Sequence, residues 1–304
     1  MKTIFIIPLL LISLISPASW GADFDKGLAA AQSGDFATAL REWRPLAEQG
    51  LANAQYNLGQ MYRNGDGVTQ NYKTAVKWYT LAAEQGDAFA QNALGAMYDF
   101  GQGVTQDYKA ALKWFRLAAE QGLANAQYNL GQMYRNGNGV TQDYKAALKW
   151  YTLAAEQGLA NAQYNQGVMY DFGQGVTQDY KAALKVYRLA AEQGHAGAQN
   201  ALGAMYDSGS GVTQDYKAAL KWYTLAAEQG LANAQYNLGV MYYEGQGVIQ
   251  HNVYAHMWAN ISRANGVEPA GELLEIIERK MTSSQIEKAQ DLARACVAKN
   301  YKGC

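Results

Sequence analysis

The chain has 304 residues, of which 49% are hydrophobic, 12% aromatic and 17% charged, with a net charge of −1. This composition is too apolar for a disordered chain. It also lacks the basic excess that a nucleic-acid-binding protein uses to neutralise phosphates. Only four prolines interrupt a chain rich in alanine, leucine, lysine, glutamate and glutamine. The composition therefore predicts an all-α protein.

The N-terminus has the pattern of a secretory signal peptide. A short basic start, Met1 and Lys2, precedes an apolar run over 4–15 and small residues over 16–22. The run is too short for a membrane-spanning helix, which needs about 20 apolar residues, so a retained anchor is the weaker alternative. We predict a signal peptide over 1–22, export to the periplasm or beyond the cell, and no integral membrane segment after cleavage.

Two cysteines, Cys296 and Cys304, lie at the extreme C-terminus. An oxidising compartment favours a disulfide between such a pair. The alternative is a redox-active or metal-binding pair, but the spacing fits no zinc or thioredoxin-type motif. The sequence therefore predicts a disulfide.

The centre of the chain is a repeat array. The tetrapeptide Ala-Glu-Gln-Gly and a Met-Tyr pair both recur every 36 residues, which predicts a stacked solenoid of short units. We expect a partial N-terminal repeat over 23–50 and a C-terminal helical cap over 267–304. The six full repeats, within 51–266, are 51–86, 87–122, 123–158, 159–194, 195–230 and 231–266.

Each repeat has the pattern of two helices joined by a glycine-rich loop. In the third repeat the first helix is expected over 124–136, ending at Gly137, because glycine adopts the left-handed conformation that follows a helix. Asp143 is expected to cap a second helix over 144–157. The recurring tryptophan, Trp150 in this repeat, is expected in the core shared by neighbouring repeats.

The recurring motifs resemble those of a known repeat family. The patterns Ala-x-Ala-Gln-x-x-Leu-Gly-x-Met-Tyr, Gly-x-Gly-Val-x-Gln-Asp-Tyr and Ala-x-x-Trp-Tyr-x-x-Ala-Ala-Glu-Gln-Gly resemble the Sel-1-like repeat family, a relative of the tetratricopeptide repeats. The resemblance covers 51–266 and implies a right-handed α-solenoid of helix-turn-helix repeats that binds or scaffolds other proteins. Val186 and Gln166 depart from the pattern, so we expect the repeat 159–194 to be the least well packed.

The sequence shows few patterns that are typical of catalytic, cofactor-binding or metal sites. The three histidines have no metal-ligand spacing, and the recurring Gly-x-Gly pairs lack the strand and third glycine of a dinucleotide-binding loop. No Gly-x-Ser-x-Gly nucleophile motif occurs. We therefore predict no enzyme activity, no cofactor and no metal. A cell-wall or β-lactam hydrolase is the enzymatic alternative.

The repeats differ from one another mainly at positions 3, 6, 7, 10, 13 and 14, which share one face of the first helix. We call these positions the first-helix face. The resemblance to tetratricopeptide repeats places this face on the concave surface, where asparagine amides and tyrosine rings suit the binding of an extended peptide. The predicted partner-binding residues are Tyr56, Asn57, Arg63, Asn92, Phe100, Tyr128, Asn129, Arg135, Tyr164, Asn165, Asp171, Asn200, Tyr236 and Asn237.

These observations favour an exported, non-enzymatic scaffold whose concave face binds a protein or peptide. A binder of cell-wall glycan or peptide could use the same asparagines and tyrosines. A third interpretation is that the first-helix face drifted after duplication and binds nothing.

Overall fold

The computed structural model describes residues 21–304. The predicted signal peptide lies almost wholly outside these residues and stays a prediction. The chain divides into two compact units, one comprising residues up to Ala126 with 138–140, the other 127–137 with 141–304. The described residues form 16 helices and no strand, which confirms the all-α prediction.

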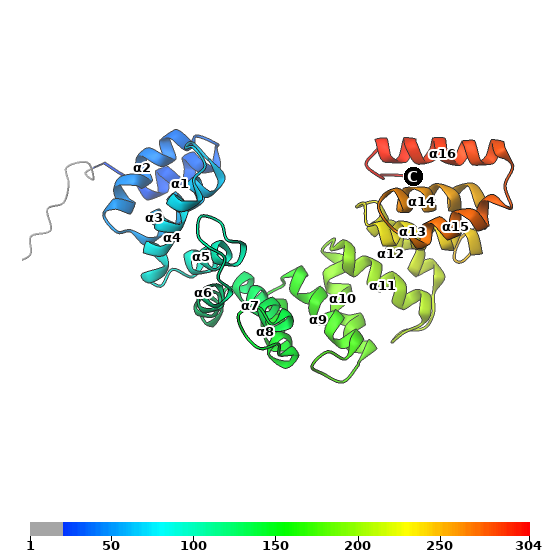
Figure 1. Cartoon of the computed structure of the whole chain (residues 1–304), viewed down its shortest axis with the longest axis horizontal. Helices are drawn as coiled ribbons and strands as arrows, with labels where there is room; N and C mark the ends of the chain where they lie inside the picture. Colours follow the sequence, from blue (N-terminus) through cyan, green and yellow to red (C-terminus); the bar gives the residue numbers. More distant parts are fainter. Residues whose placement is uncertain (1–20) are drawn as a thin grey trace, which may run out of the picture. The chain divides into compact units, whose positions relative to one another are not determined.

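The helices follow one another in pairs (Figure 1). The first unit holds α1 (Phe24–Gln32), α2 (Phe36–Glu48), α3 (Ala52–Asn64), α4 (Tyr72–Glu84), α5 (Ala88–Phe100) and α6 (Tyr108–Glu120). The second unit holds most of α7 (Ala124–Asn136), then α8 (Tyr144–Glu156), α9 (Ala160–Phe172), α10 (Tyr180–Glu192), α11 (Ala196–Ser208), α12 (Tyr216–Ala227), α13 (Ala232–Glu244), α14 (Asn252–Ala264), α15 (Pro269–Glu278) and α16 (Ser283–Ala298).

The helices end and begin at the glycine and aspartate residues that the sequence predicts. α7 ends at Asn136, and Gly137 follows it with φ of 77°, in the left-handed region that favours glycine. The Asp143 side chain accepts a hydrogen bond of 3.0 Å from the Ala146 N–H and so caps α8. The same arrangement recurs in the other repeats and gives the solenoid its period of 36 residues.

In the first five repeats the buried aromatic residue is not at the predicted position, whereas in the sixth repeat the predicted tryptophan, Trp258, is buried. Trp150 is partly exposed, with the Lys149 ammonium 5.5 Å from its ring centroid, so its placement in the core is wrong. The neighbouring Tyr151 is fully buried. Its ring lies against Gly131, where a Cβ would come within 2.8 Å of the ring carbons. The equivalent buried aromatic residues in other repeats are Tyr79, Phe115, Tyr187 and Tyr223.

Gln166, which replaces the leucine of other repeats, makes a hydrogen bond in place of the apolar contact. Its side chain is buried and donates a hydrogen bond of 3.0 Å to the Thr152 hydroxyl of the preceding repeat. A polar link between repeats thus stands where leucine packs elsewhere.

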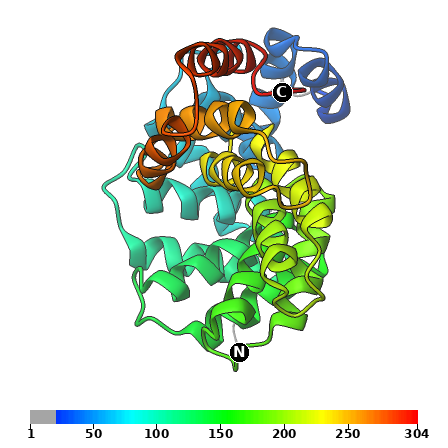
Figure 2. The ribbon, with the colours of Figure 1, turned by 90° about the vertical axis from the view of Figure 1, so that its right-hand side faces the viewer.

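Beyond the sixth repeat, α15 and α16 cover α14 (Figure 2). The His256 side chain of α14 is buried, and its Nε2 lies 2.9 Å from Oε1 of Glu278 at the end of α15. Thr282 and Gln285 form the capping box at the start of α16. The C-terminal helices therefore pack directly on the last repeat.

Candidate functional site

The tyrosines of the first-helix face pack on the buried aromatic residues of their own repeats. The rings of Tyr56 and Tyr79 have centroids 5.9 Å apart, and their planes are tilted relative to each other. Tyr56 also places its hydroxyl within 2.6 Å of Gln60 Nε2, which donates to it. These tyrosines therefore support the fold as well as presenting one edge to solvent. The equivalent pairs are Tyr128–Tyr151 and Tyr164–Tyr187, each at 5.8 Å.

Several predicted asparagines bond across neighbouring first helices. Asn165 is buried: its Oδ1 accepts a hydrogen bond of 3.3 Å from Arg135, and its Nδ2 donates to the Tyr128 hydroxyl at 3.4 Å. Asn237 Nδ2 donates to Asn200 Oδ1 at 3.0 Å. These three asparagines therefore contribute to the packing between neighbouring repeats. Asn57, Asn92 and Asn129 are partly exposed, as is Tyr236.

Positions 10 and 13 of each repeat change together. In the first repeat, the buried Tyr79 hydroxyl donates to Gln60 at position 10, over 3.2 Å, and Arg63 occupies position 13. In the fourth repeat position 10 is valine, and the Tyr187 hydroxyl donates to Asp171 at position 13, also over 3.2 Å. Sequence reasoning missed this coupling, although the paired changes were visible among the repeats.

The aspartates at position 13 are partly withdrawn from water. Burial raises the pKa of Asp99, Asp171 and Asp207 above the ordinary aspartate value. Tyr187 and Tyr223 offset part of the rise by donating to Asp171 and Asp207. Asp99 has no such partner, because its repeat carries Phe115, which lacks a hydroxyl.

Two phenylalanines at position 14 of this face extend into solvent. Phe100 is 69% exposed and Phe172 is 68% exposed. Each is the last residue of its first helix, α5 or α9, and directly follows a position-13 aspartate. Large apolar side chains with this exposure are suited to contacts with a partner.

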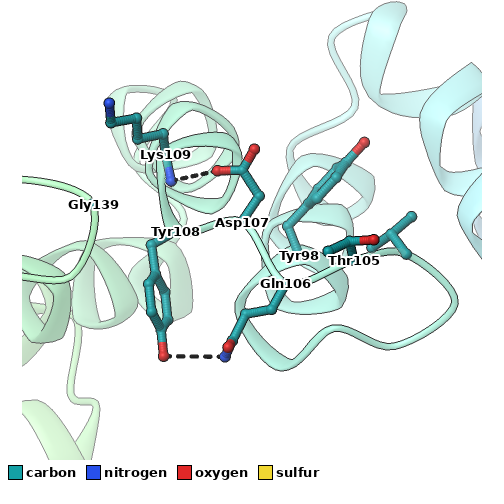
Figure 3. A pocket seen from close by; sticks show the side chains of 8 residues that line it. Tyr98, Thr105, Gln106, Asp107, Tyr108, Lys109 and Gly139 are labelled. Carbon is teal, nitrogen blue, oxygen red and sulfur yellow. Dashed lines mark hydrogen bonds between the residues drawn. The ribbon is translucent and has the colours of Figure 1, made fainter.

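A hollow recurs at the loops between the helices. In the first unit it has a volume of about 560 Å³ (Figure 3). Its polar groups are used locally: Gln106 donates to the Tyr108 hydroxyl at 3.1 Å, and Asp107 accepts from the Lys109 N–H at 2.9 Å. A second copy of about 590 Å³ surrounds Tyr216 three repeats later, so the hollow follows from the repeat geometry. The lining residues in the first unit are Tyr98, Val104, Thr105, Gln106, Asp107, Tyr108, Lys109 and Gly139.

Within residues 21–304, no group of three or more histidine, cysteine, aspartate or glutamate side chains has an arrangement that could hold a metal ion. None of the helices over the same residues combines the length and the apolar character needed to cross a membrane.

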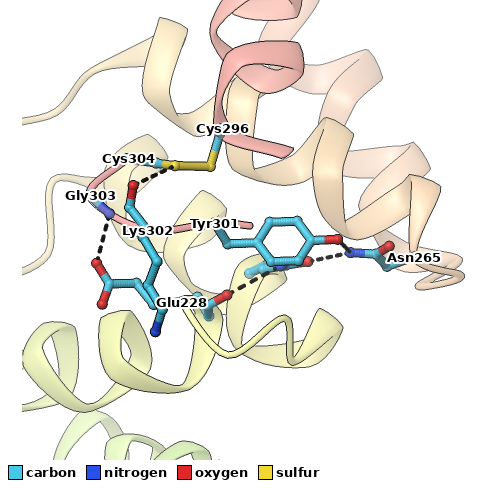
Figure 4. Close-up of a disulfide and its surroundings, with 9 residues drawn as sticks. Glu228, Asn265, Cys296, Tyr301, Lys302, Gly303 and Cys304 are labelled. Atoms are coloured by element: carbon cyan, nitrogen blue, oxygen red, sulfur yellow. Dashed lines mark hydrogen bonds between the residues drawn. A yellow bond between two sulfur atoms is a disulfide. The ribbon is translucent and has the colours of Figure 1, made fainter. Parts of the chain in front are cut away.

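The predicted cysteine pair lies at disulfide distance, with the two sulfurs 2.10 Å apart (Figure 4). The closed loop docks on the last repeats. The Gly303 N–H donates to Glu228 Oε1 at 3.1 Å, and Asn265 Nδ2 donates to the Tyr301 hydroxyl at 3.4 Å. The bridge therefore holds the C-terminal residues against the ends of α12 and α14.

Known proteins share this architecture. The Sel1 repeat family matches six consecutive segments, 52–87, 88–123, 124–159, 160–195, 196–231 and 232–267. A Sel1 repeat protein from Oxalobacter formigenes is 34% identical, with a TM-score of 0.72 over 80% of this chain and 100% of that chain. The protein c5321 of uropathogenic Escherichia coli, described as a protective antigen with an SLR fold, is 28% identical, with a TM-score of 0.52 over 91% of this chain and 85% of that chain. No curated protein matches the chain.

Proposed function

The chain belongs to the Sel1 repeat family, and from that premise we propose that it is an exported, non-enzymatic scaffold that binds a protein or peptide through the first-helix face. Sel1 repeat solenoids commonly act as protein-interaction scaffolds. The N-terminal pattern of a basic start, an apolar run and small residues supports export.

The observation that carries this proposal is the contrast between a constant interior and a variable face. The glycine at position 9, Gly59 or Gly131 for example, recurs in all six repeats, whereas position 13 varies among arginine, aspartate and tyrosine. Varied polar and charged side chains on a rigid scaffold select a partner by complementarity. The exposed rings of Phe100 and Phe172 add apolar contact area beside the charges.

Site-specific photo-crosslinking in the native host tests the binding face. A photoreactive phenylalanine analogue replaces Phe100 or Phe172, which it matches in shape. The matched controls carry the analogue at Leu117 or Leu189, exposed positions on the second helices of the same two repeats. We expect partner crosslinks from the first-helix positions and few from the controls. Crosslinks confined to Leu117 and Leu189 would contradict the proposal.

Two further measurements separate the alternatives. Sequencing the N-terminus of the protein recovered from the host tests export, with a start at or near Asp23 as the expected result. Incubation of the purified chain with muropeptides and β-lactams tests the enzymatic alternative, and we expect no turnover. Retention on cell-wall saccharide, together with no protein crosslink, would favour the glycan binder instead.

A further inference from the structure

Three first helices of the second unit, α9, α11 and α13, carry charge of one sign, unlike α7, which carries Arg135. α9, α11 and α13 contain no lysine or arginine, and each has one acidic residue, Asp171, Asp207 or Glu244 respectively. The second helices between them carry the lysines, such as Lys181 and Lys185 on α10. The first-helix face of these three repeats is therefore negative, which favours a positively charged partner.

Two of these acids are placed to receive a cation. Asp171 and Asp207 occupy position 13 of neighbouring repeats, and both are partly buried. Each accepts a hydrogen bond from a buried tyrosine hydroxyl, that of Tyr187 at 3.2 Å for Asp171 and that of Tyr223 for Asp207. Neither forms an ion pair within the described part of the chain. The Arg135 guanidinium donates to Asn165. A cationic side chain would restore the solvation that these carboxylates have lost.

The chain itself places a basic side chain at the next equivalent position. Position 13 of the sixth repeat is Tyr243, and Lys280, just beyond α15, donates to its hydroxyl at 2.6 Å. The Lys280 ammonium also lies 4.5 Å from the centroid of the tyrosine ring. A lysine from a segment outside the helix pairs can therefore reach position 13 of a repeat.

We propose that α9 and α11 bind a basic segment of the partner, with one lysine or arginine on Asp171 and a second on Asp207. This inference rests on the proposed function and names the chemistry of the partner. Phe172, next to Asp171, is 68% exposed and can cover the aliphatic stem of the bound lysine.

A single segment can cross from one helix to the other. The Tyr164 ring of α9 stacks on His195 at the start of α11, with centroids 4.6 Å apart, so the two first helices contact each other through side chains. An extended chain advances about 3.3–3.6 Å per residue, so a peptide with lysine at every third position offers a charge roughly every 10 Å along its length.

Fluorescence anisotropy with a defined peptide tests this inference. The probe is a labelled nine-residue peptide of glycine and serine with lysine at every third position, added to the purified full chain. Asp171→Asn and Asp207→Asn remove the charges but keep an oxygen for the tyrosine hydroxyls. We expect each variant to weaken binding about threefold and the double variant about tenfold. Glu156→Gln with Glu192→Gln is the charge-matched control, at exposed ends of α8 and α10, and should bind like the wild type.

Equal affinity for wild type and the double aspartate variant overturns the inference, as does an equal loss in the control. Binding too weak to detect with wild type overturns it as well. Self-association that the double variant abolishes, without a change in peptide binding, would assign the face to a second copy of the chain and also overturn it. Crosslinks from Phe172 to a partner that lacks a basic segment would leave the proposed function standing while this inference fails.

Discussion

Gln229 donates its side-chain Nε2 to Oε1 of Gln199 at 2.7 Å, joining the end of the second helix of the fifth repeat to its first helix. Gln199 in turn donates to the Ala191 carbonyl of the preceding repeat at 3.1 Å and is itself buried. The two bonds form a rung that ties successive helix pairs. Equivalent rungs pass through Gln55, Gln91, Gln163 and, with Asn265 as donor, Gln235.

The rung predicts a stability effect at Gln199. Gln199→Leu fills similar space but removes the hydrogen bonds to the Ala191 carbonyl and from the Gln229 amide, which keep their bonds to the Gly194 N–H and the Leu225 carbonyl. An intramolecular hydrogen bond contributes about 0.5–1.5 kcal/mol, so for the two lost bonds we expect a loss of about 1–3 kcal/mol in the free energy of unfolding measured with urea. Gln290→Leu, on the exposed side of α16, is the control and should change it by less than about 0.5 kcal/mol. A loss at Gln290 as large as that at Gln199 would show that the rung contributes nothing specific.

A second prediction concerns the two neighbouring aromatic residues of the third repeat. Tyr151→Ala should lower the free energy of unfolding by about 3–5 kcal/mol, because it leaves a cavity over Gly131. Trp150→Ala should cost less, because that ring is partly exposed. Tyr151→Phe isolates the hydroxyl that bonds to Gln132 and should cost about 0.5–1.5 kcal/mol.

Hydrogen exchange tests where the loss is felt. In a repeat array each repeat contacts mainly its neighbours, so Tyr151→Ala should reduce protection most in the third repeat and in those beside it. A greater loss for Trp150→Ala than for Tyr151→Ala would contradict the assignment of the buried residue. Uniform loss over all six repeats would contradict local coupling.

The contrast between Trp150 and Tyr151 shows what the sequence could and could not predict. The period of 36 residues, Gly137 and Asp143 predicted the helix pairs and their ends, because these depend on local backbone chemistry. Trp150 and Tyr151 recur with the same regularity, so the period alone could not say which ring faces the core. Neighbouring helix residues point about 100° apart, and the deciding feature is the space above Gly131, which belongs to another helix.

The candidate site was less predictable for the same reason. The variable positions of the first helix were found by comparing repeats, but their contacts were not. Asn165 bonds to Arg135 of the preceding repeat, and Asp171 accepts from Tyr187 on a different helix. Such contacts depend on how helices stack, which no single repeat specifies.

A third prediction concerns the cysteine pair. Cys304→Ser should release the C-terminal loop, so that Gly303 and Tyr301 lose their contacts with Glu228 and Asn265. The loop between Cys296 and Cys304 is short, so the loss in stability should fall at the low end of about 2–4 kcal/mol. Faster hydrogen exchange confined to 296–304 and the ends of α12 and α14 is the expected result. Free thiols detected by alkylation and mass spectrometry of native protein would contradict the bridge and weaken the argument for export.

The fourth prediction follows from the raised pKa of Asp171 and Asp207. Since their folded-state pKa lies above the unfolded value, the folded chain binds more protons in the interval between the two. Their contribution to stability therefore falls as pH rises through that interval, and the penalty is fully present above the folded-state pKa. Below the ordinary aspartate pKa of about 3.9 both carboxyls are protonated in either state and the penalty disappears.

Asp171→Asn with Asp207→Asn removes this titration while retaining an acceptor for the hydroxyls of Tyr187 and Tyr223. We expect the double variant to unfold at a higher temperature than wild type at pH 7, and the difference to shrink as the pH is lowered toward 3.9. Thermal denaturation followed by circular dichroism measures both curves, with Glu192→Gln as an exposed control. Because the same variant should bind the basic peptide less well, a gain in stability with a loss of binding would mark the two aspartates as residues kept for a partner. Lower stability at pH 7 would instead mean that the charged carboxylates stabilise the fold, for example through attraction to Arg135.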